Sequence, residues 1–193
     1  MPFLPPPATA CWQHGQARSG FEVAYFRAEQ GGWIIDGTTA ALEDGRAWVV
    51  TYSIALDAGW VTRSALVTAR TASGSRETRL ESDGAGRWFI DGDPAPHLDG
   101  CVDVDLESSA MTNTLPVHRL DLTTGVQAAT PAAYVRALGP RVERLEQTYL
   151  GIADEAGHRR YDYAAPAFGF TSRLVYDESG LVLDYPGIAR RAG

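Results

Sequence analysis

The most informative stretch of the sequence runs from Gly86 to Leu122 and reads GRWFIDGDPAPHLDGCVDVDLESSAMTNTLPVHRLDL. Between Asp83 and Glu107 the chain carries seven acidic residues and one basic residue, Arg87, whereas the whole chain holds 24 acidic and 17 basic residues. Carboxylates that leave water together repel each other and lose hydration. This local excess of negative charge therefore requires compensation by water, a cation, arginine side chains or the hydroxyl groups of a ligand.

The segment Cys101–Leu106 alternates polar and apolar side chains with the period of a β-strand. Its valine and leucine side chains would face a core. Asp103 and Asp105 would then point together to the opposite face, about 6–7 Å apart along the strand. The pattern predicts a pair of carboxylates on one side of a β-strand.

The segment Thr112–Leu120, which follows this strand, has the features of a short helix. Asn113 and Thr114 are residue types preferred at the N-cap, and Pro116 falls in the first turn, where proline is tolerated. Arg119 would lie in the last turn, where the helix dipole favours a cation. We therefore predict a helix that begins near Asn113 or Thr114.

Length and composition limit the class of protein. The chain has 193 residues, of which 45% are hydrophobic and 10% aromatic, and this is typical of a globular domain. We expect one domain over residues 1–193, with residues 1–7 as a loose proline-rich arm. The net charge of −7 argues against nucleic acid as a partner. The sequence shows neither a signal peptide nor an apolar run of membrane-spanning length, so we expect a cytoplasmic protein with no membrane span.

The metal-binding residue types show no recognisable pattern. Cys11 and Cys101 form no disulfide framework, and we expect both as reduced thiols. The four histidines lie far apart and lack zinc-site spacing. The acidic residues of the central stretch could supply oxygen ligands to calcium, but they lack the glycine and the spacing of an EF-hand loop. We therefore predict no metal and no cofactor.

Short β-type runs separated by turn signals fill most of the remaining chain. Residues 47–56 (AWVVTYSIAL) are the most β-like, and residues 168–176 and 181–185 are expected to form a hairpin. We interpret Asp36-Gly37 as a turn. Residues 141–152 fit a helix or a strand about equally, because helical spacing of apolar residues stands in a β context. The whole pattern is typical of a barrel, a roll or a sandwich.

Three blocks of the central stretch carry a resemblance to a known family: WxxDG from Trp88, LxGCxDVDL from Leu98 and TNTLPxxRL from Thr112. At this spacing they resemble the bacterial putative glycolipid-binding family, formerly a domain of unknown function. The likeness extends over nearly the whole chain. His118 departs from the pattern, since it stands where we would expect arginine in this family.

The resemblance implies a mainly β fold, in which a long antiparallel sheet forms a spiral β-roll around one short central helix. The helix would be the TNTLP segment, and residues 141–152 would be strand. The resemblance also implies a homodimer, a remote similarity to lipoprotein-localisation factors, and an acidic pocket that holds a sugar head group. We therefore expect the partner to be a glycolipid or another sugar-bearing small molecule, bound without chemistry and without catalytic residues.

The expected ligand-binding residues surround the paired carboxylates. Asp103 and Asp105 would accept charge-assisted hydrogen bonds from sugar hydroxyls, with Asp91 as a further acceptor and Asn113 as the source of an amide. The others orient the carboxylates or offer a flat face to the sugar ring: Arg119 and Arg63, and Trp88 and Trp60.

Three alternatives stay open at this point. Each carboxylate could be satisfied by arginine or by backbone amides, since buried charges are usually paired. The pair could instead act in a glycoside hydrolase, which needs two carboxylates flanking the bond to be cleaved. The chain could also be a structural dimer without a ligand. The aromatic residues are expected in the core, although some could line a cavity for an acyl chain.

Overall fold

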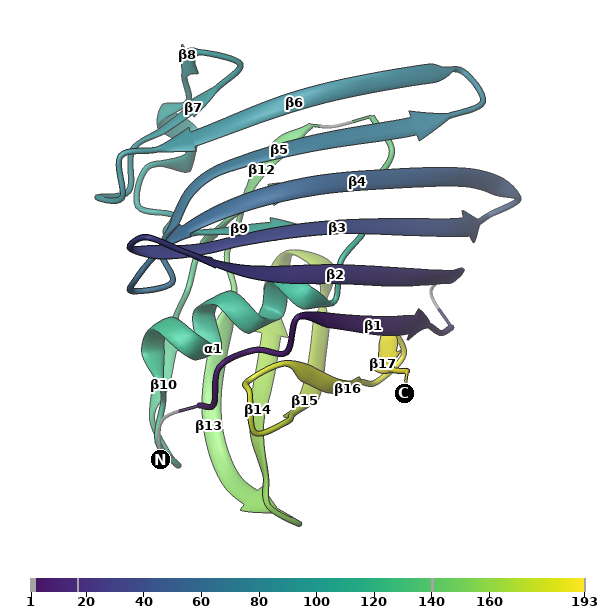
Figure 1. The fold of residues 1–193 in the computed structure, drawn as a ribbon. Helices are drawn as coiled ribbons and strands as arrows, with labels where there is room; N and C mark the ends of the chain where they lie inside the picture. The colour runs from purple at the N-terminus through teal and green to yellow at the C-terminus, as the bar shows by residue number, and fades with distance from the viewer. Residues whose placement is uncertain (1–2, 17, 140, 193) are drawn as a thin grey trace.

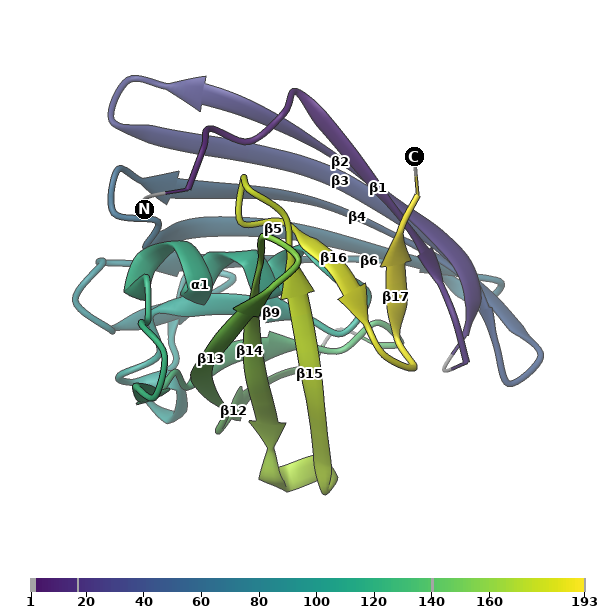
Figure 2. The ribbon, with the colours of Figure 1, turned by 90° about the horizontal axis from the view of Figure 1, so that it is seen from below.

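A computed structural model describes residues 3–16, 18–139 and 141–192 of the protein. Over these residues the fold is mainly β, with a 14-stranded antiparallel sheet, a three-stranded sheet and one short helix. Figure 1 shows the strands β2–β6 as one broad layer with the helix α1 beneath it. Figure 2, seen from below, shows α1 beside β13 on the same side of that layer. No helix in the described part of the chain is long and apolar enough to cross a membrane.

The strands of the large sheet, in their order across the sheet, are β10 (Gln127–Ala129), β13 (Thr148–Glu155), β14 (His158–Ala165), β15 (Phe170–Tyr176), β16 (Val182–Tyr185), β17 (Ala189–Arg191), β1 (Thr9–His14), β2 (Ser19–Glu29), β3 (Gly32–Glu43), β4 (Arg46–Asp57), β5 (Thr62–Thr71), β6 (Gly74–Ser82), β7 (Trp88–Ile90) and β8 (Asp93–Pro94). The small sheet consists of β12 (Val142–Leu145), β11 (Ala132–Val135) and β9 (Asp103–Leu106), and β9 pairs with β11 in parallel. Helical segments are α1 (Thr114–Leu120) and the 3-10 turns η1 (Pro96–Leu98), η2 (Met111–Asn113) and η3 (Pro166–Phe168).

The helix α1 lies where two hydrophobic cores meet. Leu115 packs into the core formed by the inward faces of β1–β6 with β9 and β11. Val117, half a turn further, packs into a second core that holds the buried tyrosines of β13–β16. A seven-residue helix is only marginally stable by itself. Its stability therefore comes from the apolar residues that it buries on both sides.

The structure confirms several sequence predictions of elements. The helix begins at Thr114 with Asn113 at its N-cap, and Arg119 lies in its last turn. The region 141–152 is strand, since it contributes β12 and the start of β13. Both cysteines are free. Residues 1–2 of the expected arm lie outside the described residues, whereas Phe3 contacts the ring of His118 at a centroid distance of 4.7 Å.

The predicted turn at Asp36-Gly37 is wrong, because both residues lie within the 12-residue strand β3. Gly37 pairs with Tyr52 across β3 and β4. A Cβ atom at Gly37 would lie 2.1 Å from Cζ of Tyr52, so the tyrosine ring occupies the space of the missing side chain. A glycine inside a strand can mark a close approach rather than a turn.

Gly37→Ala is expected to destabilise the protein by about 1–3 kcal/mol, because the added methyl group must displace the buried Tyr52 ring. Urea unfolding measures this change. Gly15→Ala is the matched control, since a Cβ atom there meets its nearest neighbour, the Ile188 carbonyl oxygen, at an ordinary 3.9 Å. Equal stabilities of the two variants would show that the Tyr52 ring can move aside without cost.

Candidate functional site

Asp103 is neutralised by an arginine. Its side chain is 1% exposed and pairs with Arg119 of α1. Nε of Arg119 donates to Oδ1 at 3.1 Å and Nη2 donates to Oδ2 at 2.5 Å. Burial raises the pKa of Asp103, while the hydrogen bonds and charge of Arg119 act in the opposite direction. Both carboxylate oxygens thus have a partner, as in the alternative reading in which arginine satisfies the acid.

Asp105 is buried but only partly satisfied. Its Oδ1 accepts a hydrogen bond of 2.9 Å from Oγ1 of Thr112. Its Oδ2 accepts no hydrogen bond from the described residues, and Asp105 lines a cavity of about 230 Å³. Burial raises the pKa of Asp105 to about 6, with a smaller contribution of the same sign from the charge of Asp103. At neutral pH this carboxylate is therefore ionised and has an acceptor oxygen available at the cavity.

Aromatic side chains form much of the wall of this cavity, which we call the β9 pocket. They come from β11, β14, β15, β16 and the turn η3: Tyr134, Tyr163, Phe168, Phe170 and Tyr185. Tyr163, Phe170 and Tyr185 lie mutually 6.0–6.2 Å apart between ring centroids. Tyr134 lies 5.5 Å from Phe168, which is 45% exposed. Such rings offer flat apolar faces with polar edges, as ligand pockets commonly do.

An ion pair forms another part of the pocket. Arg136 donates to Glu107 at 3.2 Å, and the second oxygen of Glu107 accepts the backbone N–H of Ala137 at 2.8 Å. The guanidinium carbon of Arg136 also lies 5.2 Å from the ring centroids of Tyr134 and Phe168. This arrangement leaves Arg136 and Glu107 largely occupied by each other and by their neighbours.

The pocket adjoins a buried polar cluster centred on Glu22. Ser109, which lines the pocket, donates to Oε1 of Glu22, and Tyr52 donates to the same oxygen at 2.7 Å. The backbone N–H of Ala110 donates to Oε2 at 2.7 Å. Burial raises the pKa of Glu22. These contacts hold η2, and with it the start of α1, against strand β2.

Two further polar residues complete the lining. Asn113, at the start of α1, accepts a 2.8 Å hydrogen bond from the hydroxyl of Tyr149 through its side-chain oxygen. Arg18, which precedes β2, lines the same cavity although it is only 8% exposed. Within the described part of the chain, no group of three or more His, Cys, Asp and Glu residues is placed to hold a metal ion.

The structure brings only some of the sequence-predicted residues together. Asp105 and Asn113 line the β9 pocket, whereas Asp103 and Arg119 pair with each other and are not among its lining residues. Arg63 does not contact either carboxylate of β9: its nearest acid is Asp57, at 3.9 Å.

The remaining predicted residues lie elsewhere. Asp91 is exposed and accepts the backbone N–H of Arg79 at 2.8 Å. Trp88 is buried in the first core, where its indole N–H donates to the Cys101 carbonyl at 2.9 Å. Trp60 stacks on His118 with centroids 3.7 Å apart. None of these three is among the residues that line the β9 pocket.

Sequence reasoning did not assign Arg18, Glu22, Glu107 or Arg136 to the site. One signal was present for Glu22, since it shares the inward face of β2 with Ala24 and Phe26 and is therefore a charged residue at a core position. Arg18 and Arg136 carry no comparable signal. Arg18 directly precedes β2 and Arg136 directly follows β11, and the pocket residues around them come from distant parts of the sequence.

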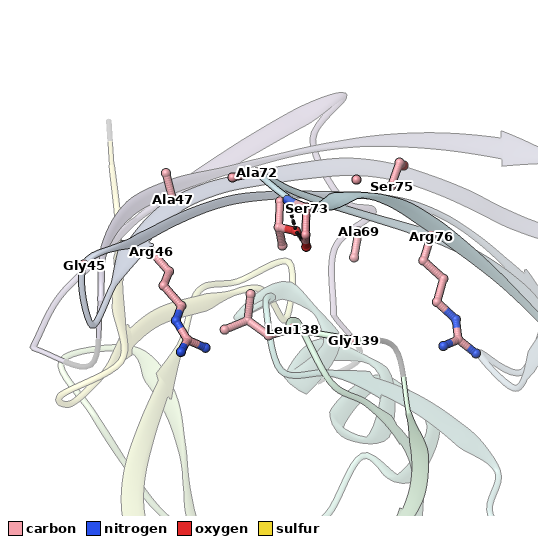
Figure 3. Close-up of a pocket in the computed structure, with 12 residues that line it drawn as sticks. Gly45, Arg46, Ala47, Ala69, Ala72, Ser73, Ser75, Arg76, Leu138 and Gly139 are labelled. Atoms are coloured by element: carbon pink, nitrogen blue, oxygen red, sulfur yellow. Dashed lines mark hydrogen bonds between the residues drawn. The ribbon is translucent and has the colours of Figure 1, made fainter.

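A larger groove of about 640 Å³ lies at the far ends of the long hairpins. Figure 3 shows Arg46 and Arg76 on either side of Leu138, with small side chains of the two hairpins above them. Among the residues that the structure describes, its lining includes neither an aromatic nor an acidic side chain. The β9 pocket combines aromatic faces, a carboxylate and arginines, so it is the stronger candidate for ligand binding.

The fold and the pocket define a mainly β protein with a small cavity whose walls are aromatic and polar. The chain belongs to the Putative glycolipid-binding family, whose model matches residues 9–191. A solved structure of a DUF1089 family protein from Pseudomonas aeruginosa is 32% identical, with a TM-score of 0.77 over 89% of this chain and 92% of that one. A DUF1849 protein from Brucella abortus shares the fold at 11% identity, with a TM-score of 0.54 over 95% and 92% of the two chains. No curated protein matches the chain.

Proposed function

We propose that the protein binds the sugar-bearing head group of an amphiphile in the β9 pocket, without chemistry. The observation that carries this proposal is the buried carboxylate of Asp105, which presents Oδ2 to an aromatic-walled cavity. Sugar hydroxyls are hydrogen-bond donors, and a carboxylate is the strongest acceptor that a side chain offers them. The family description points to the same class of ligand.

The walls suit the remaining surface of such a ligand. A sugar ring has apolar C–H faces that pack on Tyr163, Phe170 or Tyr185, whose rings surround one side of the cavity. Asn113 adds an amide beside Asp105. Phe168 lines the cavity and is 45% exposed to solvent, so it offers an apolar contact for the start of an alkyl chain.

A binding protein of this kind would use the two aspartates of β9 differently from a glycoside hydrolase. Hydrolysis needs two carboxylates that both face the sugar. Asp103 does not line the pocket and gives both oxygens to Arg119, so the pair on β9 supplies only one free carboxylate. Aryl glycosides are therefore expected to stay intact in the presence of the protein, which release of a chromogenic leaving group measures.

The proposal includes two finer features that the family resemblance implies. One is that the long sheet curls as a spiral β-roll around α1. The other is a homodimer. Analytical ultracentrifugation is expected to give the mass of two chains, and a mass of one chain would remove the dimer from the proposal without affecting the pocket.

The test is direct binding of a simple alkyl glycoside, dodecyl maltoside below its micellar concentration, measured by calorimetry. Asp105→Asn is expected to weaken binding by about tenfold or more, because hydrogen bonds to a charged group contribute about 1.5–3 kcal/mol. Asp93→Asn, which removes an exposed aspartate of β8, is the matched control and should bind like the natural protein. Unchanged binding by Asp105→Asn, or no binding by any form of the protein, would contradict the proposal. Mass spectrometry of lipids retained from a bacterial extract would then identify the natural ligand class.

A further inference from the structure

Arg18 is a buried arginine in which two of the three guanidinium nitrogens lack acceptors. The residue is 8% exposed, and its Nε and Nη1 atoms are buried with no hydrogen-bond partner among the described residues. It also makes no ion pair with any acid of the described chain. Buried guanidinium groups are nearly always paired, because a charged donor that loses water without gaining an acceptor costs several kcal/mol. An unpaired arginine that lines a cavity therefore indicates an absent partner.

The surroundings of Arg18 compensate its charge only in part. Its guanidinium carbon lies 5.3 Å from the ring centroid of Trp48, which provides a cation–π contact but no hydrogen-bond acceptor along the N–H directions. His14 is close enough for the charge of Arg18 to help lower the pKa of that histidine to about 4, although burial is the larger cause. His14 is thus neutral at pH 7, so it neither compensates nor adds to the charge of Arg18.

The acids of the pocket are engaged away from Arg18. Glu107 pairs with Arg136 and accepts the Ala137 N–H. Asp105 accepts from Thr112, and the charges that act on it are Asp103 and Glu107. Glu22 receives hydrogen bonds from Tyr52, Ser109 and Ala110. Among the described residues that line the pocket, Arg18 is therefore an unpaired cation and Asp105 an available carboxylate.

We propose that the head group carries an anionic group, a carboxylate or a phosphate, which the guanidinium of Arg18 binds while the sugar hydroxyls donate to Asp105. This inference rests on the proposed function and narrows the ligand to an acidic glycolipid. Arginine has five N–H donors and no acceptor, in a planar fork that matches the two oxygens of a carboxylate or phosphate. A neutral hydroxyl would satisfy one donor and leave the buried charge uncompensated.

The experiment compares two alkyl glycosides that differ only in the head group, dodecyl glucuronide and dodecyl glucoside, by calorimetry at pH 7. The natural protein is expected to bind the glucuronide at least tenfold more tightly. Arg18→Met is expected to abolish this preference, and Arg18→Lys to keep only part of it, because lysine lacks the fork. The melting temperature of Arg18→Met shows that the variant is folded, and we expect it not to fall, since an unpaired buried charge is removed.

The outcomes separate the two proposals. Equal affinities of the natural protein for glucuronide and glucoside would overturn the anionic head group and leave sugar binding intact. A preference for the glucuronide that survives in Arg18→Met would also overturn it, because another group would then recognise the anion. Binding of neither glycoside would overturn both. Free glucuronate and inorganic phosphate are titrated as well: affinity as high as for dodecyl glucuronide would support anion binding by Arg18 but assign it to a soluble anion instead of a lipid.

Discussion

Arg119→Ala is expected to lower the free energy of unfolding by about 3–5 kcal/mol, because it leaves the carboxylate of Asp103 buried without its partner. Asp103 is 1% exposed and has no other hydrogen-bond donor among the described residues that could replace Arg119. Salt screens a charge at this depth only weakly, so Asp103 must either stay charged without a partner or take up a proton at pH 7, and both cost free energy. Urea unfolding at pH 7 measures the loss.

A double variant separates the contribution of the ion pair to stability from the cost of leaving one buried charge without a partner. Asp103→Leu together with Arg119→Leu is expected to be far less destabilising than Arg119→Ala alone, since two apolar side chains need no partner. The matched control is Arg190→Ala, which breaks an exposed pair with Asp184 at 3.7 Å and should cost at most about 1 kcal/mol. If the double variant were as unstable as the single one, the pair would be stabilising in itself and this interpretation would be wrong.

The sequence predicts the local chemistry of the central stretch better than its surroundings. The alternation over residues 103–106 and the capping residues before Thr114 depend on neighbours in the chain, so the strand, the helix and the shared face of Asp103 and Asp105 could be predicted. Which of the two acids receives Arg119 depends on how α1 packs against β9. That packing is set by apolar contacts with both cores, which no local pattern contains.

Residues 141–152 illustrate how a periodic pattern misleads. Val142, Leu145 and Tyr149 have helical spacing, yet Val142 and Leu145 belong to β12 and Tyr149 to β13. All three are buried, but Val142 packs into the first core, whereas Leu145 and Tyr149 pack into the second. Val142 and Leu145 are the first and last residues of a four-residue strand and are therefore three positions apart without any helical repeat.

The β9 pocket could not be predicted from the sequence, because its lining residues come from segments that are far apart in the chain. Arg18 precedes β2, Tyr134 lies in β11 and Tyr185 in β16, and they meet only when both sheets have formed. Asp105 was identified because its charge was out of place in a strand. Trp60 and Trp88 were predicted as flat faces for a sugar, but neither lines the β9 pocket, whose lining includes Tyr134, Tyr163 and Tyr185 of the second core.

Asp105→Asn is expected to stabilise the folded protein at pH 7 by up to about 3 kcal/mol. Burial raises the pKa of this carboxyl to about 6, roughly two units above its ordinary value, and each unit corresponds to about 1.4 kcal/mol. Asparagine keeps an acceptor for the hydroxyl of Thr112 and carries no charge that must be desolvated. A buried charge that lowers the stability of the fold is typical of a binding site.

The pH dependence of the difference in unfolding free energy between Asp105→Asn and the natural protein identifies the Asp105 carboxyl as the destabilising group. Between about pH 4 and pH 6 the folded protein retains a proton on Asp105 that the unfolded chain has released, so this contribution to stability falls as the pH rises through that window and is constant above it. His14 and His118, whose pKa values burial lowers to about 4, act oppositely, since their contribution is lost as the pH falls from about 6.5 to 4. Because both histidines are present in both proteins, subtracting the two urea-unfolding profiles cancels them. The advantage of Asp105→Asn should therefore be small near pH 4 and complete above pH 6. An advantage that does not vary with pH, or one that Asp93→Asn shares, would show that the carboxylate of Asp105 is not the destabilising group.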